Sequence, residues 1–457
     1  MTLRRWLTLT ACCLGTFLLL VHTTAATVSV AAIARDLDAG FAQGQWIING
    51  YSLAVGALLL AAGAVGDALD HRRVFVSGMV VFILGTTGCA AAPTASVLIA
   101  SRVVQGVGGA ALLASMIPLL VHSYTGRQRA TALAIWSVCS AMGGTIGTLG
   151  SGLLAQPSLW RWLFIASLPV AVTGLVIAVV ITDGAPDGGP ARRLDWLGTG
   201  WTIGVLGSAT FALTAAGEFG IASRWTLGAI GVTLISITGL VTTERRVAAP
   251  ALPPGLFASR QFVGAVVTAF AYYLAAFGPL PTMALWLTGF GGLDPAAAAA
   301  LLAVQQVGFI VVAALLRVPE RHHTAALALG MIAIVVGVLL AAVVVAAALP
   351  ASVMLGPLVL SGAGAGVVTP ILPHRATEAA APALAGAAAG TLNAVRQFGL
   401  AAGVAACSAV ARATTTTPGA GAAVALLLAA AVATAGLIAQ RALRAPEAVA
   451  RDRRRAA

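Results

Sequence analysis

Three ionisable side chains interrupt long apolar stretches of the sequence, and they are the first candidates for chemistry. Arg102 and Arg396 each fall inside such a stretch, and His22 is the one histidine that does so. A charged side chain at the centre of a membrane helix costs about 2.5–3.5 kcal/mol on insertion scales, so an arginine retained there points to a function. An imidazole has an unperturbed pKa of about 6.5, which suits proton exchange near neutral pH.

None of the fourteen Asp and Glu residues lies in the middle of an apolar stretch. The buried carboxylate that carries protons in many membrane transporters is therefore absent. His22 could take that part, or it could form a hydrogen bond with a substrate. The alternative is a neutral histidine bonded to a neighbouring helix, which is the form that burial and the nearby Arg102 favour.

Polar and aromatic residues accompany the two arginines. Gln105 follows Arg102 by one helical turn, and Asn393 precedes Arg396 by the same spacing. Tyr272 and Tyr273 could stack against a flat substrate. The alternatives are a snorkelling or structural role for Arg102, interhelical hydrogen bonds for Arg396, and ordinary packing for the tyrosines. A cavity with two cations and no anion would repel a cationic ligand, so we expect any substrate bound there to be amphipathic and neutral or anionic.

Composition shows which elements must hold these residues. The chain has 457 residues, of which 59% are apolar and 9% charged, against roughly 25% charged in an average soluble domain. This excludes a cytosolic enzyme, a secreted disulfide scaffold and a disordered protein. A membrane-spanning helix needs about 20 apolar residues. Runs of this kind lie near 6–33, 46–66, 74–92, 96–121, 131–155, 161–182, 196–217, 225–243, 261–287, 296–316, 324–348, 352–373, 384–411 and 421–440. We therefore expect an all-α integral membrane protein with about 14 transmembrane helices.

The basic residues predict the orientation of these helices. All 26 are arginines, and placing the N-terminus inside puts the great majority of them in inner loops and tails. This is the positive-inside pattern, so we expect both termini to be cytoplasmic and the protein to lie in the plasma (inner) membrane. The formal net charge of +12 follows from the same pattern, and we expect no nucleic-acid partner.

Two polar stretches, 183–195 and 244–260, divide the chain. We expect an N-terminal six-helix bundle over 1–182, inner loops with two additional helices over 183–258, a C-terminal six-helix bundle over 259–440, and an Arg-rich cytoplasmic tail over 441–457. Glycines near 106–109 and again near 362–366 suggest that the two bundles are repeats of each other. Helical repeats around a site at the membrane midplane are typical of secondary transporters.

Six sequence blocks, in order, resemble the major facilitator superfamily, specifically its fourteen-span drug:proton antiporters. They are residues 46–75 (WIINGYSLAVGALLLAAGAVGDALDHRRVF), 102–118 (RVVQGVGGAALLASMIP), 160–169 (WRWLFIASLP), 195–198 (DWLG), 244–250 (ERRVAAP) and 393–405 (NAVRQFGLAAGVA). The resemblance covers nearly the whole chain. It implies a major-facilitator fold, in which two six-helix bundles rock about a central cavity and two extra helices are added.

The first block contains the family's gating loop, here Gly63, Asp67, Arg72 and Arg73. In the family this loop latches the outward-open state; the alternative is positive-inside charge together with a helix cap. Asp70 stands where the family usually has glycine, so we expect a less tight turn.

The resemblance also implies roles for residues inside the helices. Arg102 matches an arginine that faces the cavity and assists proton transfer, and His22 takes the place of the usual aspartate. An antiporter-like glycine motif comprises Gly143, Gly144, Gly147, Gly150 and Gly152. Glycines at these spacings let helices pack closely. The motif departs from the family at Thr148, which replaces proline, and at Ser151, which replaces glycine.

The expected function is secondary active transport: proton-driven efflux of a small amphipathic drug or antibiotic. The alternatives are a proton-coupled importer of a metabolite and a non-transporting membrane sensor. We expect that the protein is not an enzyme and that it uses no cofactor or metal. GVGGAA at 106–111 lacks the Lys-Ser/Thr of a phosphate loop, and no catalytic motif is visible in the sequence. The expected partners are a small-molecule substrate, protons and the lipid bilayer, and the expected state is a monomer.

Overall fold

The computed structural model describes residues 3–156, 159–180, 196–247, 252, 254–316, 318–381, 384–413 and 419–442, and every regular element within them is helical. The expected inner loop 183–195 and almost all of the expected tail 441–457 lie outside the described residues. So do Asp195 of the fourth sequence block and the end of the fifth.

The N-terminal helices are α1 (Leu3–Asp36), α2 (Phe41–Leu69), α3 (His71–Ala91), α4 (Ala95–Ser123), α5 (Gly126–Leu153), α6 (Trp162–Ile165) and α7 (Leu168–Val180). They are followed by α8 (Trp196–Phe219) and α9 (Arg224–Glu244). The C-terminal elements are α10 (Pro254–Phe257), α11 (Arg260–Phe277), α12 (Leu280–Gly289), α13 (Pro295–Leu315), η1 (Glu320–His322), α14 (His323–Ala346), η2 (Ala351–Met354), α15 (Leu355–Glu378), α16 (Ala385–Ala413) and α17 (Ala420–Ala442).

Each of the fourteen expected spans corresponds to a helix or to a pair of consecutive helices. Two spans are broken, one between α6 and α7 and one between α11 and α12. The second break falls at Gly278 and Pro279, where proline supplies no backbone N–H to continue the helix.

The surface of the molecule confirms an integral membrane protein. Thirteen helical segments in the described part of the chain are long and apolar enough to cross a membrane. The remaining long helix, α8, has 24 residues, and glycines and threonines interrupt its apolar sequence. Large apolar side chains are exposed along α9, for example Leu227, Leu234 and Ile235 at 56–64%. An apolar surface of this extent is covered by lipid in a membrane protein.

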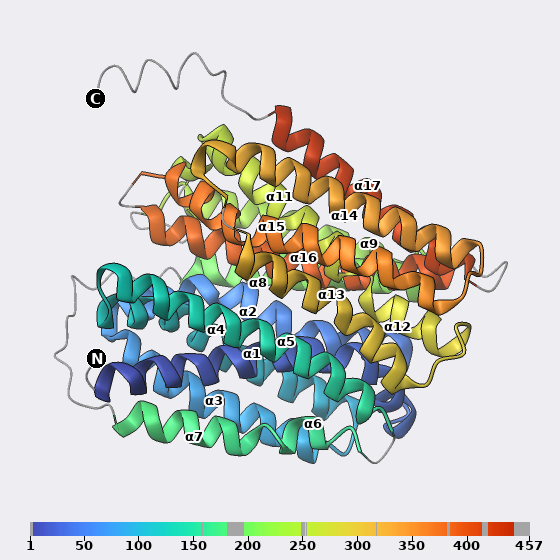
Figure 1. Cartoon of the computed structure of the whole chain (residues 1–457), viewed down its shortest axis with the longest axis horizontal. Coiled ribbons are helices and arrows are strands. Elements are labelled where there is room, and N and C mark those ends of the chain that lie inside the picture. Colours follow the sequence, from blue (N-terminus) through green and yellow to red (C-terminus); the bar gives the residue numbers. More distant parts are fainter. Residues whose placement is uncertain are drawn as a thin grey trace.

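The N-terminal helices α1–α7 and the C-terminal helices α11–α17 form two bundles (Figure 1). Glycines make matching close contacts inside each bundle. On α4, Gly106 faces the backbone of α2 and Gly108 faces the backbone of α3. On α15, Gly362 faces the backbone of α13 and Gly364 faces the backbone of α14. The glycine repeat seen in the sequence therefore places the same kind of close backbone contact in each half. A side chain at these positions would collide with a neighbouring main chain.

The bundles meet along two helix pairs, α2 with α16 and α5 with α13. In the first pair, Gly56 lies against the carbonyl of Ala394. In the second, Gly152 lies against Ala299 and the carbonyl of Pro295. The extra helix α8 packs on both α2 and α16 and pairs with α9, so the two additional helices lie beside the bundles.

Candidate functional site

Arg102 is the centre of a polar cluster inside the N-terminal bundle. Its side chain is 1% exposed, and its guanidinium donates to the carbonyl of Ile47 on α2 (3.1 Å) and to the carbonyl of His22 on α1 (3.0 Å). A third bond goes to Oε1 of Gln105 (2.7 Å), one turn along α4. The guanidinium carbon lies 4.5 Å from the ring centre of Tyr51, a cation–π contact. Within the described residues the charge is thus balanced by dipoles and a ring face, without a carboxylate.

The cluster continues from Gln105 to α3. The Gln105 amide donates to the hydroxyl of Thr86 (2.8 Å), and that hydroxyl donates to the carbonyl of Phe82 (2.7 Å). Gln105 and Thr86 are both fully buried. Arg102 therefore connects four helices of one bundle, because its fork of donors reaches α1 and α2 while Gln105 reaches α3.

His22 lies beside this network and is fully buried. Its Nε2 is 2.9 Å from the hydroxyl of Ser167, and that hydroxyl donates its single proton to the carbonyl of Phe164 (2.7 Å). With the Ser167 proton so engaged, Ser167 accepts from Nε2–H, and Nδ1 is the remaining ring nitrogen. Nδ1 is buried and has no hydrogen-bond partner. It is the one basic position in the cluster that is open to a proton.

Aromatic rings enclose the imidazole. Phe164 stacks on it and Phe82 meets it edge-on, each with ring centres 5.4 Å apart. These rings hold the imidazole plane, while Ser167 at the break between α6 and α7 holds Nε2. The environment is apolar on both faces and polar at the Nε2 edge.

A second polar cluster surrounds Arg396 in the C-terminal bundle. Arg396 on α16 is 7% exposed and donates to Oδ1 of Asn393 (3.3 Å) and to the carbonyl of Thr369 on α15 (3.1 Å). The hydroxyl of Tyr272 on α11 is 3.2 Å from the hydroxyl of Thr369. Nε of Arg396 is buried and has no partner. Unlike Arg102, this arginine keeps an unused donor.

A row of rings leads from Arg396 along α11 to α13. The guanidinium carbon lies 5.7 and 5.8 Å from the ring centres of Tyr272 and Tyr273. Tyr272 contacts Tyr273 at 4.8 Å, Tyr273 contacts Phe277 at 5.2 Å, and Phe277 contacts Phe309 at 6.5 Å. The expected stacking residues therefore belong to one continuous aromatic row.

The sequence-predicted residues thus form two sites, one in each bundle. His22, Arg102 and Gln105 come together in the first, and Tyr272, Tyr273, Asn393 and Arg396 come together in the second. Among the described residues, no hydrogen bond or ring contact joins the two clusters. The described acids all lie at or near helix ends or in turns, in agreement with the prediction that no acid is mid-span.

The connection between α2 and α3 is tighter than expected. It consists of Asp70 alone, whose φ of 149° is one that glycine adopts more readily than aspartate. Oδ1 of Asp70 accepts from the backbone N–H of Arg72 (2.9 Å) and so caps α3. The turn stays short because aspartate accepts the unfavourable φ and supplies the cap, which a glycine could not do.

The gating residues lie around this turn. The Arg72 guanidinium donates to the carbonyls of Ala178 and Val179 at the end of α7, at 3.1–3.2 Å. Arg73 is exposed, and a side chain at Gly63 would meet no atom within 4 Å. Asp67 is the third residue from the end of α2, and its side chain lies outside the description. Arg72 thus caps the C-terminus of another helix of the same bundle.

The glycine motif makes α5 the link between the bundles. Gly143 and Gly147 lie against the backbone of α1, at Phe17 and Val21. Gly144 faces Gln306 of α13 and Gly152 contacts the start of the same helix, while Gly150 faces Leu163 of α6. Thr148, in place of the family's proline, donates to the carbonyl of Gly144 (2.9 Å) within α5.

Sequence reasoning missed several polar members of the two clusters. Thr86, Ser167 and Thr369 are ordinary helix residues in sequence, and only the fold brings them to the arginines. Gln305 carried a signal, because it interrupts an apolar run that spans the membrane. Its amide donates to the carbonyl of Ala276 (2.6 Å) and to the hydroxyl of Ser361 (3.3 Å), and its Oε1 has no partner.

Comparison with known proteins adds four findings. A family model described as Major Facilitator Superfamily matches residues 12–404. The chain is 30% identical to a methylenomycin A resistance protein of Streptomyces coelicolor, covering 96% of this chain and 92% of that protein. It is 31% identical to the cephamycin export protein CmcT of Amycolatopsis lactamdurans, covering 86% and 82%. The crystal structure of the human organic anion transporter MFSD10 is similar in fold, with a TM-score of 0.66 at 15% identity, covering 96% of this chain and 100% of that one.

Proposed function

Because this chain belongs to the Major Facilitator Superfamily, we propose that it exports a small amphipathic antibiotic or drug in exchange for protons. Members of this family carry small molecules across membranes and are generally not enzymes. The proposal is supported by similarity to a cephamycin export protein and to proteins named for antibiotic resistance. The distribution of arginines favours a place in the bacterial plasma membrane with both termini cytoplasmic.

The observation that carries the proton half of this proposal is the free Nδ1 of His22. This atom is buried in a cluster that holds a fixed cation and, among the described residues, no carboxylate. Protonation there would create an imidazolium beside the Arg102 guanidinium, which is itself bonded to the carbonyl of His22. Two like charges at low dielectric repel each other strongly. The protonated state therefore favours a rearrangement of α1 against α4, which couples proton binding to a change of conformation.

The second cluster supplies the substrate half. Arg396 offers an unused donor at Nε, and the row from Tyr272 to Phe309 offers ring faces. A planar amphipathic molecule with an acidic or carbonyl oxygen would use both. A cationic drug at this cluster would meet the buried Arg396 guanidinium and, among the described residues, no compensating acid, so neutral or anionic cargo is favoured.

The movement that exposes the cargo to each side in turn is a rocking of the two bundles. The bundles correspond to 1–182 and 259–440, and they meet along α2–α16 and α5–α13. Glycines at both helix pairs let the backbones of the two bundles approach closely. We propose that such contacts allow one bundle to rotate against the other within a single chain, so a monomer is sufficient for transport.

An antibiotic-susceptibility panel in an efflux-deficient bacterial host tests the proposal. The wild-type chain should raise tolerance to neutral or anionic antibiotics, and His22→Ala and Arg102→Ala should abolish that effect at equal membrane expression. His122→Ala, an exposed histidine near the end of α4, serves as the matched control and should behave as wild type. Unchanged tolerance in both site variants would remove His22 and Arg102 from the mechanism.

Everted membrane vesicles test the direction. An exporter concentrates its substrate inside everted vesicles when their lumen is made acidic, and an importer does not. Uptake of quaternary ammonium dyes under the same conditions would contradict the proposed charge preference. Uptake that continues after the proton gradient is collapsed would contradict the proposed coupling.

A further inference from the structure

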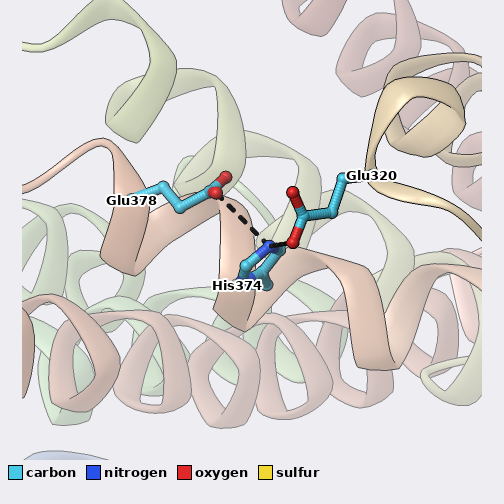
Figure 2. A group of neighbouring side chains, drawn as sticks. All are labelled: Glu320, His374 and Glu378. Atoms are coloured by element: carbon cyan, nitrogen blue, oxygen red, sulfur yellow. Dashed lines mark ion pairs between the residues drawn. The ribbon is translucent and has the colours of Figure 1, made fainter. Parts of the chain in front are cut away.

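A second group of ionisable side chains lies in the C-terminal bundle, apart from both polar clusters. His374 and Glu378 are four residues apart on α15, and Glu320 begins the short helix η1 between α13 and α14. Figure 2 shows His374 placed between the two carboxylates. Nε2 of His374 is 3.3 Å from Oε1 of Glu378 and 3.6 Å from Oε1 of Glu320.

A single hydrogen bond from His374 does not engage both carboxylates. Nε2 carries at most one hydrogen, so a neutral imidazole satisfies only one of the two carboxylates. Among the described residues neither glutamate forms an ion pair with an arginine. The side chains of Glu320 and Glu378 are 79% and 50% exposed, and each directs an oxygen toward the same ring nitrogen of His374, which is 40% exposed.

The spacing matches that of ligands around a divalent metal ion. Ligand nitrogen and oxygen atoms lie about 2.0–2.2 Å from Zn²⁺, so tetrahedral ligands are about 3.3–3.5 Å from each other. The three donor atoms here lie within 4.8 Å of one another, and two of the pairs are at 3.3 and 3.6 Å. An imidazole with two carboxylates is a ligand set that zinc and similar transition metals accept.

A cavity adjoins the group. It has a volume of about 330 Å³, and its wall includes Glu320, His374, His323 and Pro370. His323 is 9% exposed and meets His374 edge-on, with ring centres 5.3 Å apart. Nε2 of His323 lies 3.1 Å from the carbonyl oxygen of Val318, to which it is hydrogen-bonded. This bond fixes the His323 ring, which supports the ring of His374. The cavity leaves room for the water ligands that complete a three-residue site.

We propose that Glu320, His374 and Glu378 bind a divalent transition-metal ion of the zinc type. The ion connects η1 to the last turn of α15. Pro370 and Pro373 lie inside α15 just before this turn and weaken its backbone bonding. The bound ion therefore holds the end of α15 beyond the two prolines against the connection between α13 and α14, independently of the transported substrate.

Zinc titration of the purified full-length chain tests the site. The protein is prepared without a polyhistidine tag, freed of metal with a chelator, and titrated with ZnCl2 by calorimetry. We expect one ion per chain, with affinity reduced at least tenfold in His374→Ala and in Glu378→Gln. His322→Ala, which alters an exposed histidine two residues from Glu320, is the matched control and should bind within twofold of wild type.

Thermal unfolding supplies the second readout. Zinc should raise the unfolding temperature of wild type and of His322→Ala and should leave that of His374→Ala unchanged. Equal unfolding temperatures of all variants in chelator would show that they fold. Absence of a one-to-one binding phase in wild type, or binding that His374→Ala and Glu378→Gln leave intact, would overturn the proposal.

Discussion

The sharpest prediction concerns Arg102→Lys, because this change keeps the positive charge and removes the fork of donors. A lysine ammonium is more strongly hydrated than a guanidinium, so the change adds a cost of burial to the loss of hydrogen bonds, and both act in the same direction. Arg102 donates in three directions, to Ile47, His22 and Gln105. A lysine ammonium on a single flexible stem can reach one or two of these acceptors.

The structure gives the size of the effect. Hydrogen bonds to charged groups contribute about 1.5–3 kcal/mol each, so the loss of one or two costs about 1.5–6 kcal/mol of unfolding free energy. We expect Arg102→Lys to lower the unfolding midpoint in detergent, followed by tryptophan fluorescence, and to reduce antibiotic tolerance at least fourfold. Arg35→Lys is the matched control, since Arg35 is exposed and bonds only to the carbonyl of Ala31 in its own helix.

The reasoning fails if Arg102→Lys unfolds at the wild-type midpoint. That outcome would mean that the three bonds are not formed together in the membrane. If stability falls and tolerance persists, the arginine is structural and the proton assignment in this cluster is wrong.

Three further predictions follow from contacts elsewhere in the fold. Gly147→Val should destabilise the chain and abolish transport, because even a Cβ at this position would lie 2.5 Å from a carbonyl oxygen of α1. Gly200→Ala is the control: a Cβ there meets no atom within 4 Å, so the unfolding midpoint and the antibiotic tolerance should stay unchanged. Asp70→Ala should have a lower unfolding midpoint than Asp70→Gly. Both variants lose the helix cap, worth about 0.5–2 kcal/mol, but alanine also keeps the unfavourable φ, which glycine tolerates. The reverse order of midpoints would refute the assignment of strain. Asp36 lies beyond the apolar segment Leu3–Ala26, and hydrogen bonds from Trp160 and Arg161 lower its pKa below the ordinary value of 3.8. Its contribution to stability is therefore complete above that value and is lost as the pH falls below it. The difference in unfolding midpoint between wild type and Asp36→Asn should thus be full at pH 6 and shrink as the pH falls below 3.8.

The positions of the helices could be predicted from the sequence because a membrane imposes a single length and one kind of side chain on each crossing. The breaks within two crossings could not be predicted in the same way. The sequence stays apolar on both sides of Ser167. Only the fold shows that the helix is interrupted there, which brings the Ser167 hydroxyl to His22.

The candidate residues were predictable as individuals and not as groups. His22, Arg102 and Arg396 stand out because ionisable groups are expensive in lipid. Their partners do not stand out, since Arg102 is satisfied chiefly by backbone carbonyls, which every residue possesses. The turn at Asp70 was misjudged for a related reason. The substitution of glycine suggested a looser turn, whereas the aspartate side chain compensates for its own backbone conformation with a cap.

The two arginines differ in a way that separates the proposed roles. The hydrogen bonds of Arg102 bind its four helices together, and its neighbour His22 keeps an open base at Nδ1. Arg396 retains an open donor, and Gln305 in the same bundle retains an open acceptor. A proton needs a base, and an amphipathic molecule needs both donors and acceptors beside an apolar face. The N-terminal cluster is therefore suited to the proton and the C-terminal cluster to the cargo. The bundles contact each other chiefly through α2–α16 and α5–α13, while α1 also contacts α12 and α13, and α8 packs on both α2 and α16. Since no hydrogen bond or ring contact among the described residues joins the two clusters, we expect a proton to influence the cargo by moving one bundle against the other.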